Sequence, residues 1–212
     1  MKDYQDKFIR IALKSEALIF GDFTLKSGRN SPYFFNAAKM LNTKFLADLS
    51  ECYTKTLQEL DVSFDSIYGP AYKGIFLASI IGTSLGESDL DIPISFNRKE
   101  EKDHGEGGDI VGQLPSGNVL IVDDVISAGT AARESIEKIK SIGANPKVML
   151  VGLDRQEKGS SEISAKAELE NDFGLTVSSI VNLDLLISFV SDDPNFKEFK
   201  SDLEEYRSNW GA

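Results

Sequence analysis

This chain of 212 residues contains one cysteine, one histidine and one tryptophan. A single cysteine excludes an internal disulfide framework, and nothing in the spacing of potential ligands suggests a zinc site. Cys52 lies at helical spacing from Phe45 and Leu49, which predicts a place in the core. No apolar run reaches membrane-spanning length, and the first residues lack a basic-then-apolar signal pattern. We therefore expect a cytoplasmic protein.

Positive charge is also scarce, because 23 lysines and arginines stand against 34 aspartates and glutamates, giving a net charge of −11. A chain without a basic surplus has little means of displacing counterions from nucleic acid, which argues against nucleic acid as the main partner. An acidic protein that binds a phosphorylated anion must gather its few cations locally. The positions of those cations are therefore informative.

Strand-like and helix-like segments alternate between residues 64 and 181. This order predicts an α/β fold with a doubly wound, mostly parallel sheet. The length suits one domain, 1–212, in which residues 1–40 and 182–212 are elaborations. The expected helices are 3–16, 43–60, 75–85, 130–140, 162–173, 183–190 and 195–207, and the expected strands are two within 20–36, then 64–69, 92–96, 119–122, 148–153 and 176–181.

The central motif is residues 119–130, where four apolar residues precede Asp123, Asp124, small residues and a helix. We expect a buried strand that stops at the aspartates, at the carboxyl edge of the sheet. Amides of the loop and first helical turn, with the helix dipole behind them, can bind a phosphate. Ionised aspartates would repel that phosphate but accept hydrogen bonds from a diol, which indicates ribose 5-phosphate. The alternatives are aspartates that only cap the helix, or a response-regulator receiver.

Cations occur at two further places. Lys73 follows Pro70, Ala71 and Tyr72 at an expected helix start, where a cation is unfavourable unless an anion lies in front of it. Residues 98–109 contain no apolar residue and three glycines, which predicts a mobile surface loop. Because it also contains three cations and the histidine, we expect a lid over an anionic ligand. A solvated charged hairpin is the alternative.

Three more positions are candidates for binding a flat ring. Phe34 and Phe35 must point to opposite faces of their strand, so one can be core while the other stacks on a ligand. Lys26 lies near a Ser-Gly-Arg-Asn turn, where a solvated turn lysine is the alternative. Arg155 follows a strand end at the same sheet edge, and its fork suits a carboxylate or a planar acceptor pair.

Residues 123–131 resemble the phosphoribosyl diphosphate (PRPP) motif of the type I phosphoribosyltransferases. From end to end the chain resembles the orotate phosphoribosyltransferases. The motifs that carry the resemblance are the acidic pair, Phe-Thr-Leu-Lys26-Ser-Gly-Arg, Ser-Pro-Tyr-Phe34-Phe35-Asn, Gly-Pro-Ala-Tyr72-Lys73-Gly, Phe-Asn-Arg98-Lys99-Glu-Glu-Lys102-Asp-His104-Gly-Glu-Gly-Gly and Leu-Asp-Arg155-Gln-Glu.

The resemblance implies a type I phosphoribosyltransferase fold with a small N-terminal hood of helix and strands. It also implies roles for individual residues, with Lys26, Lys73, Lys102, Asp123 and Asp124 as the catalytic set. Ser127 stands where threonine is expected, but the hydroxyl is kept. The implied orotate site is Lys26, Phe34, Phe35, Ser127 and Arg155; the PRPP site is Lys26, Tyr72, Lys73, Arg98, Lys99, Lys102, His104, Asp123, Asp124, Val125, Ile126, Ser127, Ala128, Gly129, Thr130 and Ala131.

The reaction implied by the resemblance is transfer of the phosphoribosyl group of PRPP to orotate, giving orotidine 5′-monophosphate and pyrophosphate in pyrimidine synthesis. It implies Mg²⁺ held mainly by substrate oxygens and water rather than by protein ligands. It further implies a homodimer in which the lid and Lys99 serve the neighbouring site. Two rivals remain: a phosphoribosyltransferase for another base, and a PRPP-binding regulator of this fold that controls nucleic-acid binding.

Overall fold

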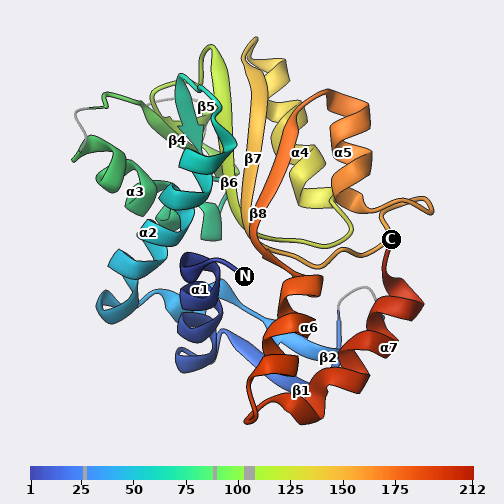
Figure 1. The fold of residues 1–212 in the computed structure, drawn as a ribbon. Helices are drawn as coiled ribbons and strands as arrows, with labels where there is room; N and C mark the ends of the chain where they lie inside the picture. Colours follow the sequence, from blue (N-terminus) through green and yellow to red (C-terminus); the bar gives the residue numbers. More distant parts are fainter. Residues whose placement is uncertain (26–27, 88–89, 103–107) are drawn as a thin grey trace.

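A computed structural model describes residues 1–25, 28–87, 90–102 and 108–212, with the backbone alone for residues 100–102 and 108. Its centre is a six-stranded sheet in the order β5-β4-β3-β6-β7-β8 (Figure 1). All neighbouring pairs in this sheet are parallel except β4–β5. The predicted mostly parallel α/β sheet is confirmed. The strands are β3 (Ser66–Tyr68), β4 (Ile94–Lys102), β5 (Gly108–Gly112), β6 (Asn118–Ile126), β7 (Asn145–Asp154) and β8 (Thr176–Asn182).

Helices cover both faces of the sheet, and the alternation of side chains along β6 explains why. Leu120 and Val122 pack into one core with α1, α2 and α3, whereas Val119 and Ile121 pack into a second core with α4 and α5. All four side chains are fully buried, as expected for a strand covered on both faces. The helices are α1 (Asp3–Lys14), α2 (Thr43–Leu60), α3 (Lys73–Gly86), α4 (Thr130–Ser141) and α5 (Ala165–Phe173).

The two ends of the chain form a second, smaller layer below the sheet in Figure 1. β1 (Leu18–Thr24) and β2 (Asn30–Phe35) pair antiparallel, and the C-terminal helices pack beside them. Phe20 of β1 stacks on Phe199 at a centroid distance of 4.9 Å, which joins the two ends of the chain. The pair of β1 and β2 confirms the strands of the predicted N-terminal hood, whose expected helix is α1. The layer also contains η1 (Ala37–Met40), α6 (Leu183–Asp192), η2 (Lys197–Phe199) and α7 (Lys200–Trp210).

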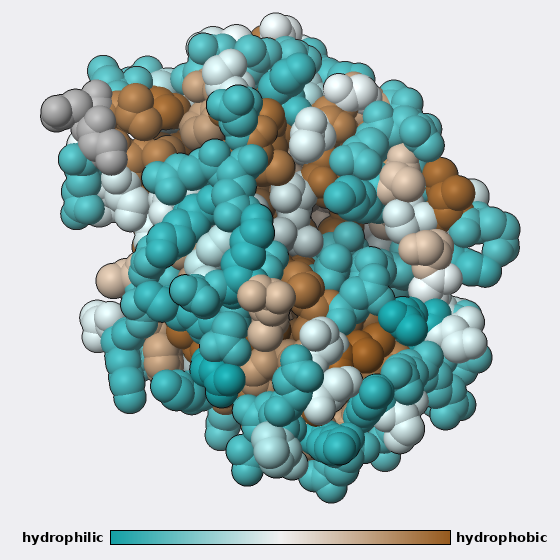
Figure 2. Space-filling view, viewed as in Figure 1, coloured by the Kyte–Doolittle hydropathy of each residue, from teal (hydrophilic) through white to brown (hydrophobic). Residues whose placement is uncertain are grey.

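The surface is mainly polar on the side seen in Figure 1, and apolar side chains gather mostly between the elements (Figure 2). No helix in the described ranges is long and apolar enough to span a membrane. Cys52 is fully buried on α2, which confirms the predicted core position. Burial raises the pKa of its thiol to about 12, so it stays protonated at neutral pH.

The central strand does not stop at the aspartates, which corrects the expectation from sequence. Pairing of β6 with β7 continues past Asp123 and Asp124 until Ile126 lies opposite Asp154. The backbone of an aspartate can still pair, and the β-branched Val125 and Ile126 that follow favour the extended conformation. The acidic pair therefore lies within a strand and inherits its rigidity.

The charged segment 98–109 is likewise more regular than predicted. Residues 98–102 continue β4, and Lys102 pairs with Gly108 of β5, a strand that the sequence did not predict. An edge ladder is held by backbone hydrogen bonds, and charged side chains are common there because they need no core. Outside residues 103–107, which are not described, the segment is therefore the charged hairpin that the sequence left as the alternative. Its action as a lid stays a prediction.

Candidate active site

Three cavities follow one another along the carboxyl edge of the sheet. The middle one shares Val125, Ser127 and Ala128 with the first cavity and Asp123 and Ala131 with the third. The first, of about 460 Å³, is lined by Thr24, Leu25, Arg29, Phe34, Phe35, Asn36, Lys73, Val125, Ser127, Ala128, Arg155 and Glu157. The second, of about 230 Å³, is lined by Asp123, residues 125–132 and Met149. The third, of about 500 Å³, is lined by Tyr68, Pro70, Ala71, Asn97, Arg98, Lys99, Asp123, Ala131, Glu134, Ser135 and Lys138.

The acidic pair lies beside these cavities: Asp123 lines the second and third, and Asp124 pairs with Lys73, which lines the first. Nζ of Lys73 lies 2.7 Å from Oδ2 of Asp124, which is only 4% exposed. The hydroxyl of Tyr53, on α2, donates to the backbone carbonyl of Asp123 at 3.0 Å and ties this helix to β6. Burial, together with the neighbouring charge of Asp124, raises the pKa of Asp123 to about 7. The pair thus combines one carboxylate neutralised by a lysine with one that titrates near neutral pH.

The loop after the acidic pair has the geometry of an anion cradle. Gly129 has a φ of 81° and caps α4, which begins at Thr130. This left-handed conformation is strained for residues with a side chain, so glycine suits the position. The middle cavity lies against this loop and the first turn of α4. Free amides at a helix N-terminus and the positive end of its dipole favour a phosphate in such a cavity.

The loop that carries Lys73 is fixed against the sheet by two glycines. A Cβ on Gly69 would lie 2.1 Å from the carbonyl oxygen of Gly74, and one on Gly74 would lie 2.7 Å from the carbonyl oxygen of Val122. The amide of Ala71 also donates to Oδ1 of Asn97 at 2.8 Å. Backbone contact at this range leaves no room for side chains. Lys73 is therefore presented from a rigid position at the start of α3.

The third cavity is lined by part of the charged hairpin. Arg98 and Lys99 line it together with Asp123 of the acidic pair. Nζ of Lys99 lies 4.8 Å from the ring centre of Tyr72, and Tyr72 itself is 68% exposed. The predicted diphosphate residues Tyr72, Lys73, Arg98 and Lys99 thus flank the acidic pair. Lys26, His104 and the side chain of Lys102 lie outside the described part of the chain.

The first cavity lies between the hood and the sheet, and the two phenylalanines behave as predicted. Phe35 is 7% exposed and packs on Phe8 in the core, whereas Phe34 is 40% exposed and lies 5.6 Å from the ring centre of Phe23. Both contribute to the cavity wall, together with Ser127 and Arg155. An exposed aromatic ring, a hydroxyl and a guanidinium around one cavity suit a flat, anionic ring.

Several residues of this cavity were missed by the sequence reasoning. Arg29, Asn36 and Glu157 line it, and Tyr206 contacts its arginine. Arg29, Asn36 and Glu157 belong to the motifs that carry the family resemblance, so the sequence does contain a signal for them. Tyr206 gave no such signal, because its partner Arg155 lies 51 residues away in the chain.

Comparison with known proteins agrees with this geometry. Residues 38–168 match the phosphoribosyl transferase domain family. The chain is 48% identical to orotate phosphoribosyltransferase of Marinobacter nauticus and 50% identical to that of Pseudomonas savastanoi pv. phaseolicola, with 100% of both chains covered in each case. The crystal structure of orotate phosphoribosyltransferase from Francisella tularensis matches with a TM-score of 0.83 at 38% identity, covering 97% of this chain and 100% of that one. The chain therefore belongs to the orotate phosphoribosyltransferase family.

Proposed function

We propose that this protein transfers the phosphoribosyl group of PRPP to orotate, releasing orotidine 5′-monophosphate and pyrophosphate. The observation that carries this proposal is the row of three cavities. A cavity with an exposed ring and a guanidinium, an anion cradle with Asp123 on its wall, and a cavity lined by cations follow in that order. This order matches the base, the ribose 5-phosphate and the diphosphate of the two substrates.

In the middle cavity, the protein holds the ribose 5-phosphate by its two chemically different ends. The amides of the loop and of the first turn of α4 bind the phosphate. Asp123 and Asp124 accept hydrogen bonds from the sugar hydroxyls, for which ionised carboxylates are suitable acceptors. Because both aspartates lie in β6, the sugar is aligned against a rigid strand.

The chemical step separates charge, and the cations lie where the negative charge develops. Breaking the bond between the anomeric carbon and the diphosphate leaves an oxocarbenium-like ribose and adds negative charge to the leaving group. Lys73 and Arg98 stabilise that leaving group, together with Lys99, Lys102 and His104 of the hairpin that the dimer proposed below shares between subunits. Orotate needs no strong base, because its ring nitrogen is acidic, and a guanidinium such as that of Arg155 fixes its carboxylate.

Mg²⁺ fits this site as a companion of the diphosphate rather than as a protein-bound cofactor. No group of three or more acidic, histidine or cysteine ligands occurs in the residues that the structure describes. Asp123 and Asp124 offer oxygen ligands at most, so the ion would take the others from the substrate and water, as Mg²⁺ usually does. When bound, it supplies positive charge to the departing diphosphate.

We also propose a homodimer in which Lys99 and the β4–β5 hairpin serve the partner's active site. A chain with a net charge of −11 has few cations of its own, whereas the diphosphate carries several negative charges. The hairpin lies at the edge of the sheet, where it is available to a second copy. The single domain, the cytoplasmic location and the absence of nucleic-acid or membrane partners stay predictions from the sequence.

The experiment that tests the proposed reaction is an ultraviolet assay for loss of orotate in the presence of PRPP and Mg²⁺. Uracil and adenine are the control bases, since a relative with another base specificity would use one of them. Orotate should be consumed and both controls left unchanged. Turnover of a control base without orotate turnover would overturn the assignment.

A further inference from the structure

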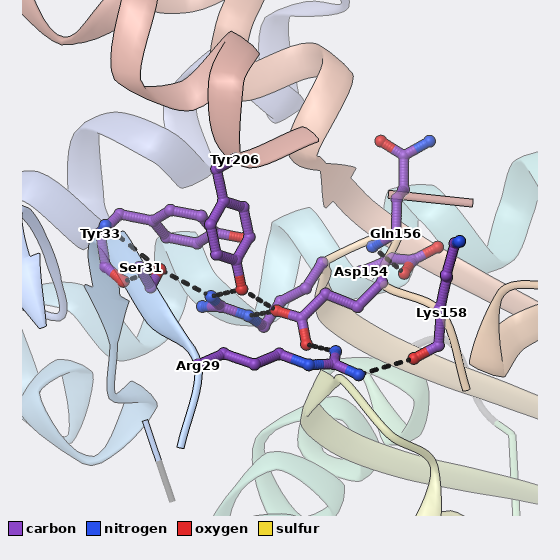
Figure 3. A network of polar contacts seen from close by, with 9 residues as sticks. Arg29, Ser31, Tyr33, Asp154, Gln156, Lys158 and Tyr206 are labelled. Atoms are coloured by element: carbon purple, nitrogen blue, oxygen red, sulfur yellow. Dashed lines mark hydrogen bonds and ion pairs between the residues drawn. The ribbon is translucent and has the colours of Figure 1, made fainter. Parts of the chain in front are cut away.

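The guanidinium of Arg155 is held by residues from distant parts of the chain. Arg155 follows β7 directly and is 4% exposed, yet it contributes to the wall of the first cavity. Its Nη2 donates to the hydroxyls of Ser31 at 2.8 Å and Tyr206 at 2.9 Å. Its Cζ lies 4.1 Å from the ring centre of Tyr33. Figure 3 shows Ser31, Tyr33 and Tyr206 converging on this network from β2 and α7.

Glu157 connects this arginine to a second one. Its Oε1 accepts from Nε of Arg155 at 2.5 Å and from the hydroxyl of Tyr206 at 2.5 Å, and its Oε2 accepts from Nη1 of Arg29 at 2.8 Å. Glu157 is only 3% exposed, so these charged hydrogen bonds are largely shielded from water. Two guanidinium groups and one carboxylate leave one positive charge in excess beside the cavity.

The end of α7 is fastened along the segment that follows Arg155. The amide of Lys158 donates to the carbonyl of Trp210 at 2.9 Å, and the amide of Ala212 donates to the carbonyl of Gln156 at 3.0 Å. The ring of Trp210 lies 5.0 Å from Cζ of Arg29. These contacts fix the position of α7, and therefore of Tyr206, relative to the cavity wall.

The hydrogen bonds of Arg155 leave a defined part of its fork available. A guanidinium has five N–H groups, of which the one on Nε and the two on Nη2 have the partners given above. Among the described residues, Nη1 has no acceptor. On the basis of the proposed function, we infer that α7 is a positioning part of the base site, in which Tyr206 and Glu157 orient Arg155 so that Nη1 donates to orotate.

Positioning matters here because the fork of arginine recognises a flat anion only in a defined orientation. Without Tyr206, Nη2 loses one acceptor and Glu157 loses one donor, so the guanidinium can turn about its long side chain. Affinity for orotate should therefore fall, whereas affinity for PRPP should not, because the cavities assigned to PRPP do not include α7. If α7 had a purely structural role, loss of the Tyr206 hydroxyl would instead weaken the binding of both substrates to a similar degree.

The test compares Tyr206→Phe with Tyr4→Phe in steady-state kinetics. The hydroxyl of Tyr4 donates to Oε2 of Glu59 at 2.7 Å, which is the same kind of contact between α1 and α2, away from the three cavities. We expect Tyr206→Phe to raise KM for orotate about tenfold, as for loss of one charged hydrogen bond, with KM for PRPP and kcat changed less than about twofold. Tyr4→Phe should leave all three parameters unchanged.

Two further variants keep the inference testable if Tyr206→Phe does not fold. Ser31→Ala removes the other partner of Nη2, and Glu157→Gln removes the charge that joins both arginines; both should raise KM for orotate selectively. Unchanged kinetics, or equal losses for both substrates, would overturn the inference while orotate turnover by the wild type upholds the proposed function. If the wild-type protein does not consume orotate, both the inference and the proposed function are wrong.

Discussion

Nζ of Lys73 lies 2.7 Å from Oδ2 of Asp124, so that the first residue of α3 and the acidic pair of β6 form one ion pair across the sheet edge. The lysine therefore meets an anion in front of the helix start even before a substrate binds. This contact compensates part of its unfavourable position against the helix dipole. The same pair also joins the ribose cavity to the cations that face the diphosphate.

Replacement of Asp123 or Asp124 should weaken the binding of PRPP far more than the binding of orotate. Asp123→Asn or Asp124→Asn removes a charged acceptor for a sugar hydroxyl, worth roughly 1.5–3 kcal/mol, so we expect a ten- to hundredfold loss of PRPP affinity. Calorimetric titration of each ligand separately measures this. Unchanged PRPP affinity in both variants would show that neither carboxylate binds the sugar.

The pH dependence of stability should reveal the titration of Asp123. Its pKa rises from 3.8 to about 7 on folding, so the folded protein binds the extra proton between these values. The free energy of unfolding should therefore fall as pH rises from 4 to 7, by up to about 4 kcal/mol from this group. Urea unfolding of the unliganded wild type and of Asp123→Asn over this range measures the difference, since the variant lacks this slope. Parallel profiles would contradict the elevated pKa.

The neighbouring phenylalanines should separate binding from stability. Phe35→Ala empties part of the core and should cost about 3–5 kcal/mol of unfolding free energy. Phe34→Ala removes an exposed ring and should change stability by less than about 1 kcal/mol while raising KM for orotate. Each variant serves as the control for the other in thermal unfolding and in the orotate assay. If both variants raised KM for orotate in proportion to their loss of unfolding free energy, stacking of Phe34 on orotate would be contradicted.

Lys102→Ala should act on the chemical step. If this lysine meets charge that develops on the diphosphate, turnover should fall by roughly a hundredfold or more with much smaller changes in both Michaelis constants. Steady-state kinetics with each substrate varied in turn distinguishes the two effects. Weaker binding with turnover preserved would make Lys102 an ordinary binding residue.

Mixing inactive variants tests whether subunits share the hairpin. A Lys99→Ala subunit combined with an Asp123→Asn subunit should give a dimer with one doubly defective and one intact site, restoring about half the activity. Each variant incubated alone is the control. Self-contained sites would regain nothing, and sedimentation as a monomer at assay concentration would contradict the shared site directly.

The parts of the fold that rest on local patterns could be predicted from the sequence. Four consecutive apolar residues, 119–122, indicated the buried core of β6, where all four side chains are fully buried. The opposite environments of Phe34 and Phe35 followed from the geometry of a strand. Such features depend on nearby residues alone.

Features that depend on distant pairing could not be predicted in this way. Aspartates disfavour strands, so only the partner strand β7 shows that β6 continues to Ile126. The backbone ladder of β4 and β5 leaves no apolar pattern in residues 98–102. The bond between Arg155 and Tyr206 spans 51 residues, and no local signal predicts it.

The contact between Gly69 and Gly74 has a consequence for inhibitor resistance. A compound that occupies the third cavity, which Pro70 and Ala71 of this loop line, can ordinarily be excluded by a nearby substitution that adds bulk. Here any added Cβ would collide with backbone atoms at 2.1 Å or 2.7 Å before it reached the compound. Substitution of Gly69 or Gly74 should therefore not yield a resistant enzyme, because it would disrupt the enzyme as well as the inhibitor site.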